Sequence, residues 1–233
     1  MSAVFKREFK AYFQTPIGWI FLAAIYFFLG LYFYIIYSTG SPDMSAVILS
    51  MSTIMVFAMP IITMRLMSED RRQKVDQALL TAPLKLSGLV LGKFWAALSL
   101  FALGFAPTVI FEVIILSHLQ VGFVAYIYSL FGILLLGGAL IAIGMFISSL
   151  TENPVVSAIV SLIINFVALY MTSFAEMVKV GWISTVLKKA AFMNAFQSFG
   201  ESMFSIANIV YFLSIIAAFL FLCTRVLEKR RWA

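Results

Sequence analysis

Six long runs of apolar residues follow one another along this chain, and each is long enough to cross a lipid bilayer as a helix. A bilayer core of about 30 Å requires about 20 apolar residues in a helix. The runs cover residues 17–37, 47–66, 94–116, 123–150, 155–174 and 206–226. The pattern predicts an all-α integral membrane protein with six transmembrane helices, which form one domain over residues 1–233.

The N-terminal residues 4–16 mix apolar and charged positions with the period of a helix. The apolar positions, which fall on one face, are Phe5, Phe9, Tyr12 and Phe13. The charged positions among them are Lys6, Arg7, Glu8 and Lys10. Such an amphipathic helix is expected to lie in the membrane interface before the first span. A frayed tail beside the membrane is the alternative.

The connection between spans two and three, residues 67–93, holds the densest charge in the chain. Within it, Glu69, Asp70, Arg72 and Asp76 include pairs that lie three and four positions apart. In one helix, opposite charges at these separations pair along a face. Two interpretations stay open. The segment is either a charged helix, continuous with span two, that engages a soluble partner, or a solvated loop.

The connection before span six, residues 175–205, is also patterned. Its apolar positions Trp182, Ile183, Val186 and Leu187 fall on one helical face, opposite Lys188 and Lys189. This pattern predicts an amphipathic helix at the outer interface or dipping partly into the bilayer. A cap over a pathway and a loop lying on the surface are both compatible with it.

Composition narrows the class of protein. The 233 residues are 63% hydrophobic and 11% charged, whereas an ordinary soluble domain is about 45–50% apolar and about 25% charged. A soluble fold of this size cannot bury that excess, and disordered chains are poor in aromatic residues, which make up 16% here. The single cysteine excludes a disulfide scaffold and any multi-cysteine metal site.

The basic residues predict the orientation in the membrane. Of the 16 lysines and arginines, 13 lie in the N-terminal segment, the connection after span two and the C-terminal end. Only Lys179, Lys188 and Lys189 lie on the other side. The positive-inside rule therefore predicts that both termini are cytoplasmic. Topology also explains the net charge of +6, which is then no argument for a nucleic-acid partner.

Two polar residues inside the spans are candidate pathway or gate residues. Glu112 lies in span three, five residues after Pro107, and Asn165 lies deep in span five. A carboxylate in the membrane usually faces protein or water. Glu112 is therefore either a gate or substrate contact, or a carboxylate that snorkels outward or pairs with Lys188 or Lys189. Asn165 is expected to form a hydrogen bond between helices.

Two parts of the chain, residues 76–94 and residues 148–158, resemble the signatures of a transporter family. Residues 76–84 read Asp-Gln-Ala-Leu-Leu-Thr-Ala-Pro-Leu, and residues 89–94 read Leu-Val-Leu-Gly-Lys-Phe. They are similar to the LLT-x-P and VLGK sequences before the third span of ABC type-two exporter permeases. The Ser-Leu-Thr-Glu-Asn sequence of residues 149–153 is similar to the SLT-x-N turn between spans four and five. The whole chain most resembles the short permease subunit associated with gliding-motility transporters.

The resemblance implies a set of partners and contacts. It implies a multi-pass subunit of the bacterial inner membrane that pairs with a second permease half, either the same chain or a paralogous subunit. A cytoplasmic ATP-binding-cassette ATPase dimer would bind ATP and Mg and dock on a coupling helix within residues 67–93. The implied ATPase contacts are Glu69, Asp70, Arg72, Asp76, Gln77, Leu79, Leu80, Thr81 and Pro83. The implied second cytoplasmic contact is Thr151, Glu152 and Asn153.

The chain is expected to have no catalytic, cofactor or metal site of its own. Residues 88–94 superficially resemble a P-loop, but the glycines are one position too close and Phe94 stands where magnesium needs Ser or Thr. An intramembrane enzyme would need a nucleophile–base pair or metal ligands within the spans. A secondary transporter would usually show two half-repeats with polar groups at midplane. These two classes remain the alternatives to an exporter subunit.

Overall fold

Every element in the described residues of the computed structural model is an α-helix. The structure describes residues 2–40, 43–72, 86–118, 123–177, 191–200 and 205–231. The helices are α1 (Ser2–Gln14), α2 (Pro16–Ser38), α3 (Met44–Thr63), α4 (Ser68–Arg72), α6 (Leu86–Phe105), α7 (Pro107–His118), α8 (Phe123–Leu150), α9 (Pro154–Met177), α11 (Phe192–Gly200) and α12 (Ile206–Arg231).

Six stretches of the described chain are long and apolar enough to cross a membrane. They are Pro16–Ser38, Met44–Arg72, Leu86–Ser117, Phe123–Leu150, Pro154–Ala175 and Ile206–Arg230. Each overlaps one of the six apolar runs of the sequence. The prediction of an all-α chain with six membrane-length helices is confirmed.

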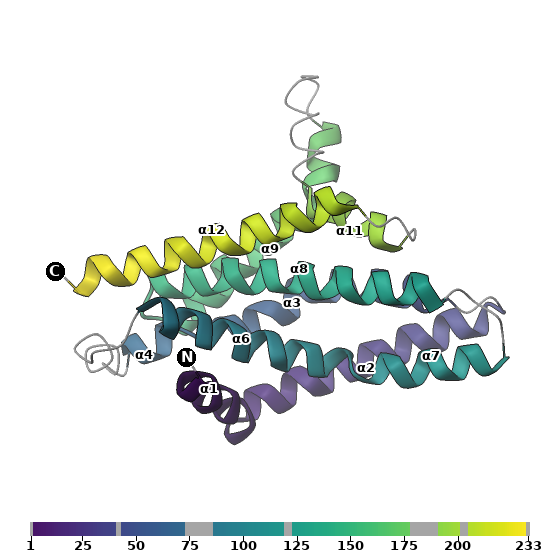
Figure 1. The fold of residues 1–233 in the computed structure, drawn as a ribbon, viewed down its shortest axis with the longest axis horizontal. Helices are drawn as coiled ribbons and strands as arrows, with labels where there is room; N and C mark the ends of the chain where they lie inside the picture. The colour runs from purple at the N-terminus through teal and green to yellow at the C-terminus, as the bar shows by residue number, and fades with distance from the viewer. Residues whose placement is uncertain are drawn as a thin grey trace.

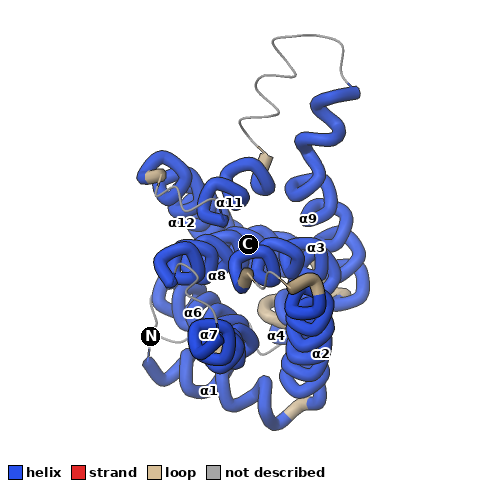
Figure 2. Tube along the Cα trace, turned by 90° about the vertical axis from the view of Figure 1, so that its right-hand side faces the viewer, coloured by secondary structure: helices blue, strands red, loops and turns tan. Residues whose placement is uncertain are grey.

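The spans form a bundle around α8. Figure 1 shows them running side by side, and in the end-on view of Figure 2 α8 lies near the middle. It contacts α3, α6, α9, α11 and α12. Nearly all of its second half is buried, whereas α2, α9 and α12 expose long apolar faces. The exposed apolar faces are those expected of helices that border on lipid.

Glycines in α8 allow this central position. A Cβ atom on Gly144 would lie 2.7 Å from the Cβ of Thr63 in α3, and one on Gly137 would lie 2.6 Å from the Cζ atom of Phe101 in α6. Both distances are shorter than van der Waals contact, so only glycine fits. Small residues at helix contacts let membrane helices approach closely.

Helix α1 lies across one end of the bundle. In Figure 1 it is seen end-on while the spans run across the page. It contacts α2 and α6, and the apolar side chains of Phe5, Phe9 and Phe13 pack against the core. The turn from α1 to α2 is tight, because a Cβ on Gly18 would lie 2.9 Å from the carbonyl carbon of Tyr12. We call this end, which also carries α4 and the C-terminal end of α12, the basic end.

The third span differs in its bounds from the apolar run. Its helix begins at Leu86 rather than Phe94, so Lys93 lies two turns inside α6. The span is also broken at Ala106, because Pro107 starts a new helix, α7. Proline has no backbone N–H and is favoured at the first turn of a helix.

Of the predicted outer segment, residues 178–190 and 201–204 lie outside the described part of the chain. The described part holds α11, whose Phe192, Phe196 and Phe199 side chains are buried. A Cβ on Gly132 of α8 would lie 2.8 Å from the Cβ of Phe199, so α11 sits directly on α8. Helix α11 therefore packs into the bundle at the end opposite to α4.

Candidate functional site

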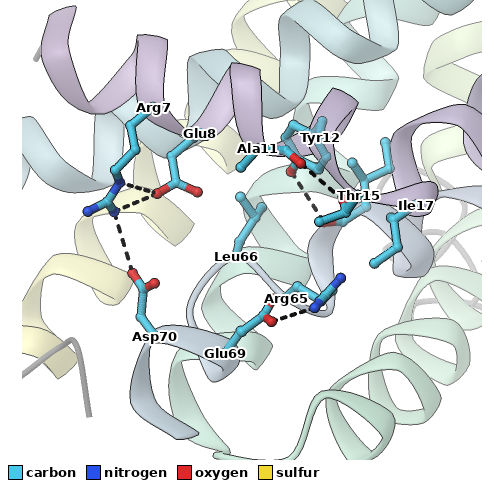
Figure 3. A pocket seen from close by; sticks show the side chains of 11 residues that line it. Arg7, Glu8, Ala11, Tyr12, Thr15, Ile17, Arg65, Leu66, Glu69 and Asp70 are labelled. Atoms are coloured by element: carbon cyan, nitrogen blue, oxygen red, sulfur yellow. Dashed lines mark hydrogen bonds and ion pairs between the residues drawn. The ribbon is translucent and has the colours of Figure 1, made fainter. Parts of the chain in front are cut away.

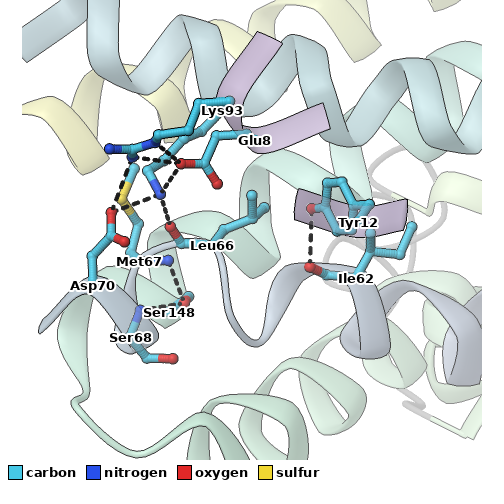
Figure 4. Close-up of polar contacts among 10 residues, drawn as sticks. Glu8, Tyr12, Ile62, Leu66, Met67, Ser68, Asp70, Lys93 and Ser148 are labelled. Atoms are coloured by element: carbon cyan, nitrogen blue, oxygen red, sulfur yellow. Dashed lines mark hydrogen bonds and ion pairs between the residues drawn. The ribbon is translucent and has the colours of Figure 1, made fainter. Parts of the chain in front are cut away.

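Lys93 is the centre of a group of charged residues at the basic end. Its side chain is only 1% exposed, although lysine is rarely buried without partners. The Nζ atom lies 2.8 Å from Oδ2 of Asp70 and 3.1 Å from Oε1 of Glu8, and it donates a hydrogen bond of 2.6 Å to the carbonyl of Leu66. Figure 4 shows these three contacts. An ammonium group has three donors, and here each has an acceptor.

Arg7 of α1 completes the group. Its Nη2 atom lies 2.6 Å from Oε1 of Glu8 and 3.9 Å from Oδ2 of Asp70. Although burial opposes its charge, the hydrogen bond with Glu8 and the charges of Glu8 and Asp70 raise the pKa of Arg7. The two cations and two carboxylates balance. We refer to Arg7, Glu8, Asp70 and Lys93 as the ionic cluster, which joins α1, α4 and α6.

A cavity of 230 Å³ lies beside the ionic cluster (Figure 3). Its walls include Arg7, Glu8, Tyr12, Glu69 and Asp70. Arg65 pairs with Glu69 on one wall. The Tyr12 hydroxyl donates to the carbonyl of Ile62 at 3.3 Å, and burial raises the pKa of this phenol well above its usual range. The cavity therefore lies between α1 and the end of α3.

The chain turns sharply between α3 and α4, and α8 holds this turn in place. The Ser148 hydroxyl accepts hydrogen bonds from the backbone N–H groups of Met67 (3.1 Å) and Ser68 (3.0 Å), and it donates to the carbonyl of Met64 at 3.1 Å. Figure 4 shows the two bonds that Ser148 accepts. These are backbone groups that a break in a helix leaves without partners. The turn is thus bonded to α8 through Ser148 and to α6 through Lys93.

The loop between α8 and α9 lies against α4. Arg71 forms an ion pair of 2.7 Å with Glu152 and donates to the carbonyl of Leu150 at 3.2 Å. In the loop itself, the Thr151 hydroxyl accepts from the N–H of Asn153, and the Asn153 side chain accepts from the N–H of Val155. Asn153 therefore caps the start of α9.

The structure brings together part of the predicted contact set. Glu69, Asp70 and Arg72 lie in α4, and Glu152 lies beside them through Arg71. The residues Asp76, Gln77, Leu79, Leu80, Thr81 and Pro83 lie outside the described residues. The described structure bears on two details that were predicted for the segment before them.

The first correction concerns continuity. A helix running on from span two was one of the two interpretations of this segment, but residues 64–67 form a turn that separates α3 from α4. The second detail, pairing along one helix face, is described only in part. Glu69 pairs with Arg65 four positions earlier, whereas Asp70 pairs with Lys93 of α6 and Arg7 of α1. Asp76, which lies four positions after Arg72, is outside the described residues.

Glu112 is buried within the bundle, with 3% of the residue exposed. It lies on the face of α7 that also buries Thr108 and Ile115, and Thr108 shares a hydrogen bond of 3.0 Å with the hydroxyl of Tyr126 in α8. The expected snorkelling to the surface is therefore not observed. Lys188 and Lys189, its predicted partners, lie outside the described residues.

Asn165 does not form the expected hydrogen bond between helices. Both polar atoms of its side chain are buried, and neither has a hydrogen-bond partner in the described part of the chain. The hydroxyls of Ser157 and Ser161, one and two turns earlier in α9, share this property. The three residues form a buried polar stripe on α9.

Sequence reasoning missed the partners that complete the site. The sequence indicated only interfacial or cytoplasmic charges at Arg7, Glu8 and Arg71, and it did not indicate the hydrogen bonds of Ser148. For Lys93 a signal existed, because the apolar residues 89–91 precede it and the apolar run from Phe94 follows it directly, and a lysine so placed is a candidate for a paired, buried charge. No local pattern pairs it with Glu8 or Asp70.

In the comparison with known proteins, no family model and no curated protein matches the chain. In the residues that the structure describes, no group of three or more His, Cys, Asp and Glu side chains is placed to hold a metal ion. Fold and site together define a polytopic α-helical membrane protein with a charged site at one end of its bundle.

Proposed function

We propose that this chain is the membrane subunit of an ATP-driven exporter of the ABC type-two class. It works with a separate cytoplasmic ATPase dimer, which binds ATP and Mg, and with a second permease half. Both termini and the basic end face the cytoplasm of a bacterial cell, and substrate moves across or out of the inner membrane. The proposal rests on the two sequence resemblances and on one structural observation.

That observation is the number of elements attached to α4. The five residues Ser68–Arg72 contact α1 through the ionic cluster, α6 through Lys93, and the loop before α9 through Arg71 and Glu152. The turn before α4 is held by Ser148 of α8. A force applied to α4 would therefore reach four other parts of the bundle through hydrogen bonds and ion pairs.

This arrangement suits a coupling element. In the proposed mechanism the ATPase docks on residues 69–83 and on Thr151, Glu152 and Asn153. ATP binding closes the ATPase dimer and moves α4, and the ionic cluster transmits that movement to α1 and to the start of α6. Buried polar networks of this kind change between discrete arrangements rather than deform continuously, which is the property that a switch needs.

Purification of the full chain from its own cells in a mild detergent tests the proposal. We expect an ATP-binding-cassette ATPase in the eluate in an amount comparable to the chain, identified by mass spectrometry, together with Mg-dependent ATP hydrolysis. A single band for the chain without any ATPase would contradict the proposal and favour a secondary transporter or an intramembrane enzyme.

Two substitutions then test the coupling contact. Asp76→Lys reverses one charge and Leu79→Asp breaks the apolar pair Leu79–Leu80. Each is expected to abolish ATP hydrolysis by the complex while the chain still inserts into the membrane. Glu228→Lys is the matched control, because it reverses a charge at the basic end in an exposed pair with Arg225 on α12. Full ATP hydrolysis in the first two variants would show that residues 69–83 do not form the ATPase contact.

A further inference from the structure

A deep apolar groove lies among α6, α8 and α12. It has a volume of 780 Å³, and its lining is apolar almost throughout. Leu91 and Leu98 line it from α6, Phe131 and Gly138 from α8, and Leu213 and Phe221 from α12. The groove is separate from the ionic cluster and shares no residue with it.

Gly138 gives the groove its depth. A Cβ atom at this position would lie 3.1 Å from the end of the Ile216 side chain and 3.8 Å from that of Leu98. Any side chain larger than hydrogen would fill the space between the three helices. The floor of the groove is therefore a bare helix backbone bordered by aliphatic side chains.

The groove is about as long as one half of a membrane core is thick. It runs from Ser87 to Leu98 along α6 and from Thr224 to Leu213 along α12. Eleven residues of helix rise about 16 Å, which is about half of a hydrocarbon core of about 30 Å. Beyond Leu213, α11 stands against α12, because Phe192 stacks edge-on against Tyr211 and Phe212. The groove is thus closed by α11 at the end that lies away from the basic end.

The open end of the groove, at the basic end, carries polar and cationic groups. Ser87 and Thr224 contribute hydroxyls. The guanidinium of Arg225 lies 4.9 Å from the ring centroid of Phe221, which lines the groove. Its side chain is 63% exposed and pairs with Glu228 through Nη1 alone, so other N–H donors of the guanidinium face outward.

We propose that this groove binds one acyl chain of a phospholipid from the leaflet at the basic end, with the phosphate of that lipid at Arg225. An acyl chain extends across one leaflet, which is the length of the groove. A transmembrane helix of a partner would need the full thickness of the core, and α11 blocks that path. An anionic headgroup also complements the cationic mouth. The inference requires six membrane spans and is independent of the exporter assignment.

Retention of lipid by the purified full chain tests the proposal. The chain is reconstituted with phosphatidylglycerol, returned to mild detergent and analysed by native mass spectrometry. We expect one tightly held phosphatidylglycerol per chain. Ala217→Trp fills the groove and should abolish retention. Ala218→Trp, an equally exposed neighbour on α12 that does not line the groove, should retain the lipid like the original chain.

Arg225→Gln provides a second test that leaves the groove itself intact. Loss of a charge-assisted contact to phosphate should weaken retention of phosphatidylglycerol by about tenfold or more. Absence of bound lipid in the original chain, or equal retention by Ala217→Trp, would overturn the proposal. It would also fail if Ala217→Trp abolished self-association of the chain while lipid retention stayed unchanged, because the groove would then be a protein interface.

Discussion

Lys93 is a charge that the protein keeps in its interior. Moving a lysine out of water costs several kcal/mol, and this cost is offset only when every donor has a partner. Glu8, Asp70 and the carbonyl of Leu66 supply the three acceptors. Loss of Lys93 would leave two carboxylates, each less than a quarter exposed, with Arg7 as their remaining partner.

Lys93→Met is therefore expected to lower the free energy of unfolding by about 3 kcal/mol or more. Thermal unfolding of the purified chain in detergent measures the change. Lys229→Met, which removes an exposed lysine on α12, is the control and should alter stability by about 0.5 kcal/mol or less.

The addition of Asp70→Asn to Lys93→Met should restore more than half of the lost stability. The double variant keeps the close pair of Arg7 and Glu8 and removes the carboxylate that has lost its main partner. Strictly additive losses in the double variant would show that Lys93 and Asp70 do not interact energetically. The claim that Asp70 offsets the cost of burying Lys93 would then be wrong.

At the scale of single residues, the sequence predicted which charged residues interact better than it predicted their partners. It singled out Asp70 and Glu69 as interacting charges, and both do interact, but with partners from other elements or an earlier turn. Lys93 lies 23 positions from Asp70 and 85 from Glu8. Contacts over such separations depend on how helices pack, which no local spacing encodes.

Among the helices, α8 carries the clearest relation between sequence and packing. Gly144 faces Thr63 of α3 at a distance where no side chain fits. The sequence did not indicate that α3, α6 and α11 would each contact a different glycine of α8.

Gly144→Ala is expected to destabilise the chain by about 1–3 kcal/mol, because the added methyl group collides with Thr63 across the α3–α8 contact. Gly30→Ala is the matched control, since a Cβ there has nothing within 4 Å and a helix gains up to about 1 kcal/mol from the exchange. Unfolding in detergent distinguishes the two variants. Equal stability for both would contradict the close approach of α3 and α8.

The third span shows that hydropathy alone does not predict where a helix begins. Apolar character begins at Phe94, but the helix begins at Leu86, because residues 86–93 are buried against α1 on one face rather than exposed. A helix that packs against another protein element does not need an apolar residue at every position. Pro107, by contrast, marked the break between α6 and α7 directly in the sequence.

Among the described residues, most of the charged side chains lie at one end of the molecule. The ionic cluster, α4, the loop before α9 and the end of α12 all lie at the basic end. The positive-inside rule predicts that this end faces the cytoplasm. Cys223, the single cysteine, is buried, so its replacement by alanine provides a background for labelling single cysteines.

In that background, Ser38→Cys is expected to react with a membrane-impermeant thiol reagent added to intact cells, because Ser38 lies exposed at the end opposite to α4. Lys10→Cys and Lys229→Cys, both exposed at the basic end, should react only after the cells are opened. Gel shift of the labelled chain measures each reaction. Labelling of Lys10→Cys in intact cells would reverse the predicted orientation.

What the sequence determined by itself is the class and the number of spans. Hydrophobic length and the excess of basic residues are properties of contiguous segments, and a bilayer selects for them directly. Only the tertiary structure decided that Lys93 is buried between Glu8 and Asp70, that Ser148 holds the turn before α4, and that an apolar groove opens among α6, α8 and α12. Each of these requires three or more helices to meet, and their meeting depends on packing between residues that are distant along the chain.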